Sequence, residues 1–173
     1  MSAPGPSPDV YLAGPDGFTP GGLAWHRREL VPAAVAAGLR PLSPWDGFDA
    51  EFAALAAMPA GDARLAAYRD LNIRVGAANA AMIDRAAGVL AVLDGTDVDS
   101  GTAAEVGYAS ARGRLVVGLR TDVRSAGDNE GSLVNLQVEH FIRCSGGRIF
   151  RSLEPAVAFL AARLRGPGPQ PAP

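Results

Sequence analysis

One short stretch near the middle of the chain restricts the fold more than any other feature. Residues 89–93 are five consecutive apolar residues, a pattern typical of a strand that is buried on both faces of its sheet. The run stops at a turn signal, Asp94-Gly95, and a loop of small residues leads into a helical pattern that we expect to begin at Thr102. A buried strand followed at once by a helix is the building unit of α/β proteins with parallel sheets.

The rest of the chain repeats this alternation of apolar strands and helical patterns. Strands are predicted at residues 9–13, 39–42, 89–93, 115–119 and 148–150. Helices are predicted at residues 22–37, 50–58, 62–86, from 102 onward, 133–142 and 154–164. This order predicts an α/β fold with a doubly wound, mostly parallel five-stranded sheet, arranged as a flavodoxin-like three-layer sandwich.

The two ends of the chain differ from the part between them. Residues 1–8 and 166–173 are rich in Pro and Gly and hold few apolar side chains, so we expect both segments to be disordered tails. Between them no shift in composition marks a second domain, and we expect one domain over residues 9–165.

Composition restricts the classes of function. The formal net charge of −2 gives no electrostatic reason to expect nucleic acid as a partner. The basic residues are all Arg, and without a lysine amine a Schiff-base mechanism is excluded. No apolar run reaches the roughly 20 residues that cross a bilayer, and the N-terminus lacks the pattern of a signal peptide. The single cysteine, Cys144, fits a reducing cytoplasm, and we expect it to be a small core residue.

Carboxylates cluster where the central strand ends and the next helix begins. Asp99 precedes this helix, Glu105 would lie in its first turn, and Gly101 between them lets the backbone pass close to a ligand. Ligands of open α/β sheets bind at this edge, beyond the carboxyl ends of the strands. Two carboxylates at a sugar-sized site suggest glycosyl chemistry, in which one attacks the anomeric carbon and the second handles the proton of the leaving group. Because a helix N-terminus favours negative charge, we expect Glu105 to be the ionised nucleophile.

A purely structural interpretation competes with this one. Thr102-Ala-Ala-Glu105 also fits a capping box, in which the Glu side chain bonds to the backbone at the start of its own helix. His26 is the other residue considered for a special role, but no second ligand stands at metal-binding spacing around it. We therefore expect neither a metal nor an organic cofactor.

Three segments, in the same order along the chain, resemble the nucleoside 2-deoxyribosyltransferase family. They are residues 91–109, residues 10–15 and residues 134–137, and the likeness extends from about residue 9 to residue 154. The resemblance implies that Glu105 is the nucleophile and that Asp99 binds the sugar hydroxyls. The third segment is similar to one that a subunit contributes to its neighbour's active site, which implies a homo-oligomer. The smallest such assembly is a dimer, and a trimer of dimers would be a hexamer.

The same resemblance assigns the residues that would bind the substrate. They are Tyr11, Gly14, Asp16, Phe18, Asp46, Asn79, Asp94 and Gly101, with Asn135 and Gln137 from the neighbouring subunit. Asp16 or Asp46 would assist departure of the base, and Trp45 or Phe48 could stack on it. Asn79 stands where some members carry Asp, and it can donate a hydrogen bond but cannot act as a carboxylic acid.

The expected activity is transfer of a 2-deoxyribosyl group between nucleobases through a covalent deoxyribosyl-glutamate, a reaction of nucleotide salvage. Its substrates would be a deoxynucleoside and a free nucleobase, and Asn135, where related nucleotide hydrolases present Ser, favours a free 5'-hydroxyl over a 5'-phosphate. Two alternatives stay open at this stage. One is an N-glycoside hydrolase that acts on nucleosides or their 5'-monophosphates, and the other is a non-catalytic module that senses nucleotides.

Overall fold

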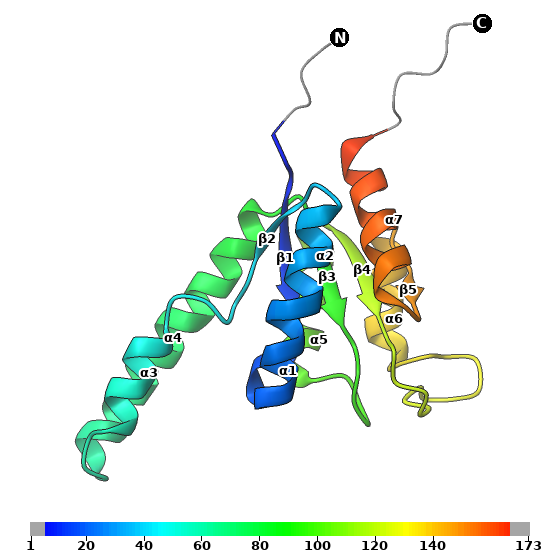
Figure 1. Ribbon diagram of the computed structural model, residues 1–173. Helices are drawn as coiled ribbons and strands as arrows, with labels where there is room; N and C mark the ends of the chain where they lie inside the picture. Colours follow the sequence, from blue (N-terminus) through cyan, green and yellow to red (C-terminus); the bar gives the residue numbers. More distant parts are fainter. Residues whose placement is uncertain (1–5, 167–173) are drawn as a thin grey trace, which may run out of the picture.

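A five-stranded parallel sheet forms the centre of the computed structural model, which describes residues 6–166 (Figure 1). Its strand order is β2-β1-β3-β4-β5, and each pair of neighbours is parallel. The strands are β1 (Asp9–Ala13), β2 (Arg40–Leu42), β3 (Gly88–Val92), β4 (Leu115–Leu119) and β5 (Ile149–Phe150). This is the strand order of flavodoxin-like folds, so the fold class predicted from the sequence is confirmed.

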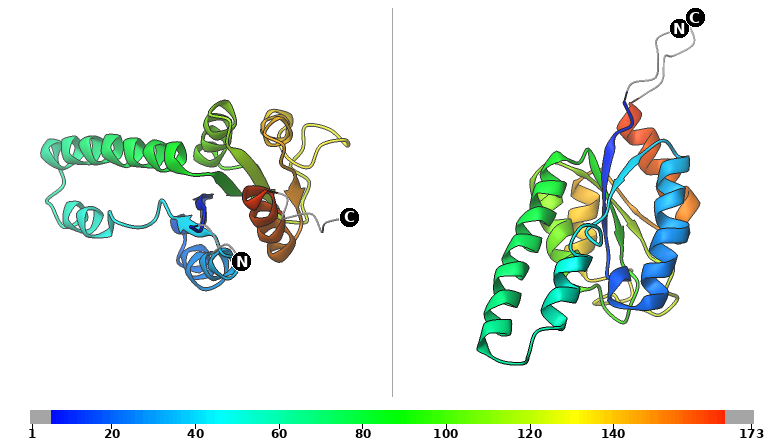
Figure 2. Two further views of the ribbon diagram at one scale, coloured as in Figure 1. Left: turned by 90° about the horizontal axis from the view of Figure 1, so that it is seen from above. Right: turned by 60° about the vertical axis from the view of Figure 1, so that its left-hand side comes forward.

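Helices cover both faces of the sheet and complete a three-layer sandwich (Figure 2). They are α1 (Pro20–Trp25), η2 (His26–Leu30), α2 (Val31–Ala36), α3 (Asp49–Ala56), α4 (Asp62–Arg85), α5 (Ser100–Ala111), α6 (Leu136–Cys144) and α7 (Leu153–Arg165), and η1 (Asp16–Phe18) is a short 3-10 turn. The layer on one face holds α4, α5 and α6, and the layer on the other holds α7 together with the continuous helix that α1, η2 and α2 form.

The central strand β3 contributes to both halves of the core. Val89 and Ala91 pack toward α4, α5 and α6, whereas Leu90 and Val92 pack toward α2 and α7. Every residue of β3 is buried, which explains why the sequence shows a continuous apolar run here rather than an alternating pattern.

Two elements extend beyond the sheet. Helix α3 and the first half of α4 form a hairpin that projects from the body of the protein (Figures 1 and 2). Within the hairpin, Phe52 lies against Tyr68, whereas Leu65 and Ile73 are exposed on α4. Among residues 6–166, no helix combines the length and the apolar character that crossing a membrane requires.

Some helix starts and one burial prediction were wrong. The helix predicted from residue 133 begins at Leu136, because Asn135 is its N-cap. Helix α5 begins at Ser100 rather than Thr102, because Asp99 is its N-cap and accepts hydrogen bonds from the backbone nitrogen of Thr102 at 2.9 Å and from its Oγ1 at 3.1 Å. Cys144, predicted to lie in the core, is exposed in the last turn of α6.

The predicted tails fall largely outside the residues that the structure describes, because 1–5 and 167–173 are not described. At the N-terminal end of the described part, the carbonyl oxygen of Pro8 accepts a hydrogen bond from the backbone nitrogen of Arg40 at 2.9 Å. Pairing between the first two strands therefore starts one residue before β1.

Candidate active site

A pocket of about 420 Å³ opens beyond the carboxyl ends of β1 and β3. In flavodoxin-like sheets the ligand crevice lies between these two strands, where the strand order reverses. The pocket has the size of a small-molecule site. Its lining residues come from five segments and are Gly14, Gly17, Phe18, Pro44, Trp45, Phe48, Asp49, Phe52, Val75, Asn79, Gly101, Thr102 and Glu105.

Glu105 is held in this pocket by a long-range hydrogen bond. The buried Tyr11 in β1 points toward α5, and its hydroxyl donates to Oε1 of Glu105 at 2.5 Å. Glu105 lies in the second turn of α5, and Asp99 already caps the helix. The capping-box interpretation of Glu105 is therefore wrong, because its carboxylate contacts the neighbouring strand rather than the start of its own helix.

The ionisation of Glu105 also differs from the prediction. Burial raises its pKa from 4.5 to about 7, the Tyr11 hydroxyl opposes this rise, and the nearby charge of Asp99 adds to it. The prediction of a fully ionised carboxylate assumed a position in the first helical turn, where the helix dipole would favour the charge. With a pKa of about 7, protonated and ionised Glu105 are both populated at neutral pH. Burial and the Glu105 carboxylate together raise the pKa of Tyr11 far above its usual range, so this phenol keeps its proton.

Aromatic side chains form the wall of the pocket on the side of β2. The rings of Phe18 and Trp45 meet edge to face, with centroids 5.0 Å apart and planes at 81°. Phe48 and Phe52 continue this wall toward α3. Flat apolar surfaces of this kind suit a planar heterocyclic ring, which gains both burial and stacking.

Seven of the predicted residues line the pocket: Gly14, Phe18, Asn79, Gly101 and Glu105, and the two candidates for stacking on the base, Trp45 and Phe48. The side-chain oxygen of Asn79 is buried there without a hydrogen-bond partner in the described part of the chain. Tyr11, which was predicted to bind the substrate, is buried and does not line the pocket, and its hydroxyl contacts Glu105 instead. The pocket also brings together residues that sequence reasoning did not assign, above all Asp49 and Thr102. Asp49 is the first residue of α3, and the sequence signal that could have found it is its place directly after the aromatic loop.

Other predicted residues have different neighbours. Asp16 turns its carboxylate toward His26, with Oδ2 3.3 Å from Nδ1, and does not line the pocket. Asp46 is exposed and lies outside the pocket lining. One oxygen of Asp99, Oδ2, is used to cap α5, while its charge still acts on Glu105.

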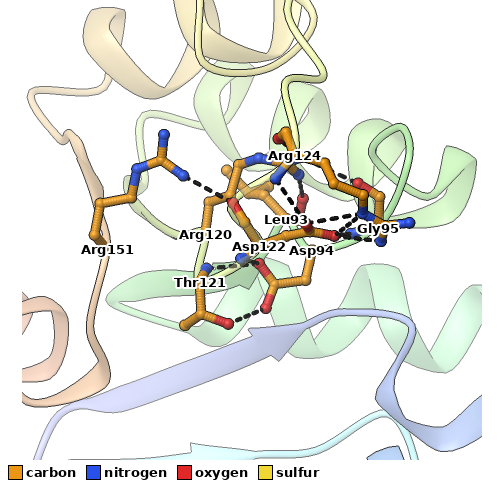
Figure 3. Close-up of polar contacts among 8 residues, drawn as sticks. All are labelled: Leu93, Asp94, Gly95, Arg120, Thr121, Asp122, Arg124 and Arg151. Carbon is orange, nitrogen blue, oxygen red and sulfur yellow. Dashed lines mark hydrogen bonds and ion pairs between the residues drawn. The ribbon is translucent and has the colours of Figure 1, made fainter.

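Asp94 joins two loops instead of facing the pocket (Figure 3). Its Oδ1 accepts hydrogen bonds from the backbone nitrogens of Thr121 at 2.6 Å and Asp122 at 2.9 Å, and its Oδ2 accepts one from the Thr121 hydroxyl at 2.5 Å. In return, Oδ2 of Asp122 accepts from the backbone nitrogen of Gly95 at 3.3 Å. The buried guanidinium of Arg120 donates to the carbonyl oxygens of Gly95 and Arg124 at 3.0 and 2.9 Å. The loop after β4 is thereby fixed to the loop after β3.

Asn135 and Gln137 do not line the pocket of their own chain. Asn135 is the N-cap of α6 and accepts a hydrogen bond from the backbone nitrogen of Gln137 at 3.0 Å. A second hollow, of about 230 Å³, lies between α4 and α5 and shares Asn79 and Glu105 with the main pocket. Glu105 therefore borders both hollows. Within residues 6–166, no group of three or more His, Cys, Asp or Glu side chains could hold a metal ion.

Comparisons with known proteins show which family and fold this chain resembles. A family model described as nucleoside 2-deoxyribosyltransferase matches residues 10–137. The chain is 29% identical over 202 residues to uncharacterized protein C191.05c of Schizosaccharomyces pombe, which covers 91% of this chain and 90% of that protein.

Two solved structures share the fold. A 2-desoxiribosyltransferase from Leishmania mexicana superposes with a TM-score of 0.62 at 25% identity, covering 89% of this chain and 97% of that one. A 2-deoxyribosyltransferase from Bacillus psychrosaccharolyticus does so with a TM-score of 0.52 at 20% identity, covering 78% of this chain and 82% of that one.

Proposed function

The chain belongs to the nucleoside 2-deoxyribosyltransferase family, and from this premise we propose that it transfers a 2-deoxyribosyl group between nucleobases, with Glu105 as the nucleophile. One observation carries the proposal. The carboxylate of Glu105 is held by Tyr11 at the floor of a nucleoside-sized pocket and is free of the helix-capping role that the sequence also allowed.

The reaction proceeds in two displacements at C1' of the sugar. An oxygen of ionised Glu105 forms a bond to C1' as the glycosidic C1'–N bond breaks, and the base nitrogen keeps the bonding electron pair and takes a proton from water. A nitrogen of the incoming base then attacks C1', the Glu105 ester bond breaks, and that base releases a proton. Two inversions retain the configuration at C1'.

Tyr11 prepares Glu105 for this role. Its hydroxyl holds Oε1, which leaves the second oxygen to face the sugar. The same hydrogen bond opposes the effect of burial on the pKa of Glu105 and so increases the ionised, nucleophilic fraction at neutral pH. Desolvation in turn makes the ionised carboxylate more reactive, because less water must be removed before attack.

The aromatic wall would bind the base, and Asp49 would contact its polar edge. Apart from Glu105, Asp49 is the carboxylate that lines the pocket, and we therefore assign it, rather than Asp16 or Asp46, to the base side. Its side chain is 78% exposed and lies 3.5 Å from Arg27, so it can accept hydrogen bonds from amino and ring N–H groups of a base at the pocket mouth. Asp99 would bind the sugar hydroxyls through the oxygen that does not cap α5.

We also propose that the active form is a homo-oligomer in which a neighbour supplies Asn135 and Gln137. Neither residue reaches the pocket of its own chain, and the hollow between α4 and α5 gives a second subunit a path to Glu105 and Asn79. The exposed apolar residues of α4 are available for the contact.

One assay tests the activity. The protein is incubated with deoxyinosine, with and without free adenine or cytosine, and products are separated by chromatography. The proposal expects a new deoxynucleoside only when an acceptor base is present, and a Glu105→Ala variant that folds without turnover. Free deoxyribose formed equally with and without acceptor would identify an N-glycosidase instead, and binding without any turnover would identify a sensor. Mass spectrometry of wild-type protein quenched during turnover should reveal a deoxyribosyl adduct on the Glu105 peptide.

A further inference from the structure

On the basis of this function, we propose that His26 is a positioning residue that holds the two loops forming the aromatic, base-binding wall. His26 begins η2, on the face of the sheet that is opposite α5, and the residue is 1% exposed. It does not line the pocket and so does not act on the substrate directly.

Both ring nitrogens of His26 contact polar groups from other segments. Nδ1 lies 3.3 Å from Oδ2 of Asp16, in the turn after β1, and Nε2 lies 3.0 Å from Oγ of Ser43, directly after β2. Oγ of Ser43 also accepts a hydrogen bond from the backbone nitrogen of Trp45 at 3.2 Å. If Nδ1 carries the proton, it donates to Asp16, and Nε2 accepts from the Ser43 hydroxyl. Every group in this hydrogen-bond network then has a partner.

The residues next to these contacts form the pocket wall. Phe18 follows Asp16 by two positions, Trp45 follows Ser43 by two, and the two rings touch. Gly17 lies against Trp45 so closely that a Cβ atom at this position would be 2.1 Å from the ring. The two loops therefore pack as one unit, and His26 connects them from behind.

The local helix geometry supports a role beyond core packing. Val31 donates its backbone N–H to the carbonyl of His26, five residues earlier, so the turn that begins at His26 is a π turn. Such turns interrupt an α-helix and are frequent at functional sites. The next residue, Arg27, pairs with Asp49 at 3.5 Å. Two consecutive residues of this turn thus contact three segments that line the pocket.

The test uses His26→Leu, which removes both polar contacts, and His26→Gln, which keeps one. Both are made in a Trp25→Phe background, so that Trp45 is the sole tryptophan and its fluorescence reports on the wall. For His26→Leu we expect KM for deoxyinosine and for the acceptor base to rise about tenfold while kcat changes less than about threefold. This pattern is expected because the wall binds the substrate and the transition state equally, so its loss raises KM without lowering kcat. Trp45 emission should shift to the red and be quenched more readily by acrylamide. His26→Gln should recover part of both effects.

The matched control is Arg28→Gln, which alters the same turn at an exposed side chain that makes no hydrogen bond or ion pair within residues 6–166. Ser43→Ala removes the other end of the link, should reproduce the KM and emission changes, and should add little to His26→Leu in a double-mutant cycle. It also provides the test if His26→Leu fails to fold.

The proposal would be overturned if KM and Trp45 emission were both unchanged in His26→Leu or in Ser43→Ala. A fall in kcat with KM constant in either of these two variants would also overturn it. The emission and quenching measurements need no turnover. If the wild-type protein converted no deoxynucleoside, the proposed function would fail, and these measurements would still decide whether His26 holds the wall.

Discussion

The stability of a Glu105→Gln variant should depend on pH in a way that reports how Glu105 is buried. Gln keeps the size of the side chain and an oxygen that accepts the Tyr11 hydroxyl, but it does not ionise. Burial raises the pKa of Glu105 from 4.5 to about 7, so the folded wild-type protein binds this proton more tightly than the unfolded chain does. The stability that the proton contributes is complete below about pH 4.5 and is lost as the pH rises through about 7.

The size of the effect follows from the same pKa. A shift of one in the pKa of a group corresponds to about 1.4 kcal/mol, so the rise from 4.5 to about 7 corresponds to at most about 3.5 kcal/mol at alkaline pH. When the pH is raised from about 5 to about 8.5, the free energy of unfolding of the Gln variant minus that of the wild type should increase by about 2 kcal/mol. The difference in Tm should widen by about 4–8 °C over the same range.

Urea unfolding followed by circular dichroism measures this difference at both pH values, at a fixed protein concentration because association shifts apparent stability. Glu29→Gln removes an exposed carboxylate and serves as the control, with a stability difference that should be small at both pH values. A constant gap between Glu105→Gln and the wild type would mean that Glu105 is solvated, and it would refute the picture of a desolvated nucleophile. The Gln variant should also lose turnover at every pH.

Other variants should change the pH profile, the base wall and the loops. Wild-type kcat/KM should rise with pH through about 7 as Glu105 ionises; a flat profile would contradict its role as the nucleophile. Tyr11→Phe removes the hydrogen bond that lowers this pKa, so the midpoint of the profile should move to higher pH, and an unchanged midpoint would exclude that function of Tyr11. Gly17→Ala places a Cβ atom 2.1 Å from the Trp45 ring and should raise KM about tenfold, which steady-state kinetics would check and an unchanged KM would contradict. Asp94→Ala removes a charged acceptor from three hydrogen bonds and should lower the free energy of unfolding by about 2–4 kcal/mol, measured in urea; a change below about 1 kcal/mol would show that the loop contact is weak.

The strands, the helices and the layers that they form could be predicted from the sequence because local apolar patterns determine which segments become buried strands and which become helices. The continuous run at residues 89–93 marks a strand buried on both faces, and the structure buries every residue of β3. The residue pattern together with the family resemblance also identified seven of the pocket-lining residues, among them Asn79 and Glu105.

The direction of the polar side chains could not be predicted in the same way. Asp94, Asp99 and Asp16 are all acidic loop residues near the sheet edge, but their partners lie on a neighbouring loop, on the helix that follows and on a distant histidine, respectively. Local hydrogen bonds of Asp to backbone compete with ligand binding, and the sequence does not show which of them prevails. The pKa of Glu105 was mispredicted for a related reason, since it depends on burial by the tertiary fold and on a hydrogen bond from Tyr11, a residue 94 positions away.

The shortness of the two edge strands of the sheet affects how copies of the chain can assemble. β2 contains three residues and β5 only two, so few backbone N–H and C=O groups stay free at either margin. Short edge strands of this kind are poor templates for adding a strand from another molecule. In the proposed homo-oligomer, copies of this chain should therefore associate through helix surfaces and loops, and each sheet should end within its own subunit.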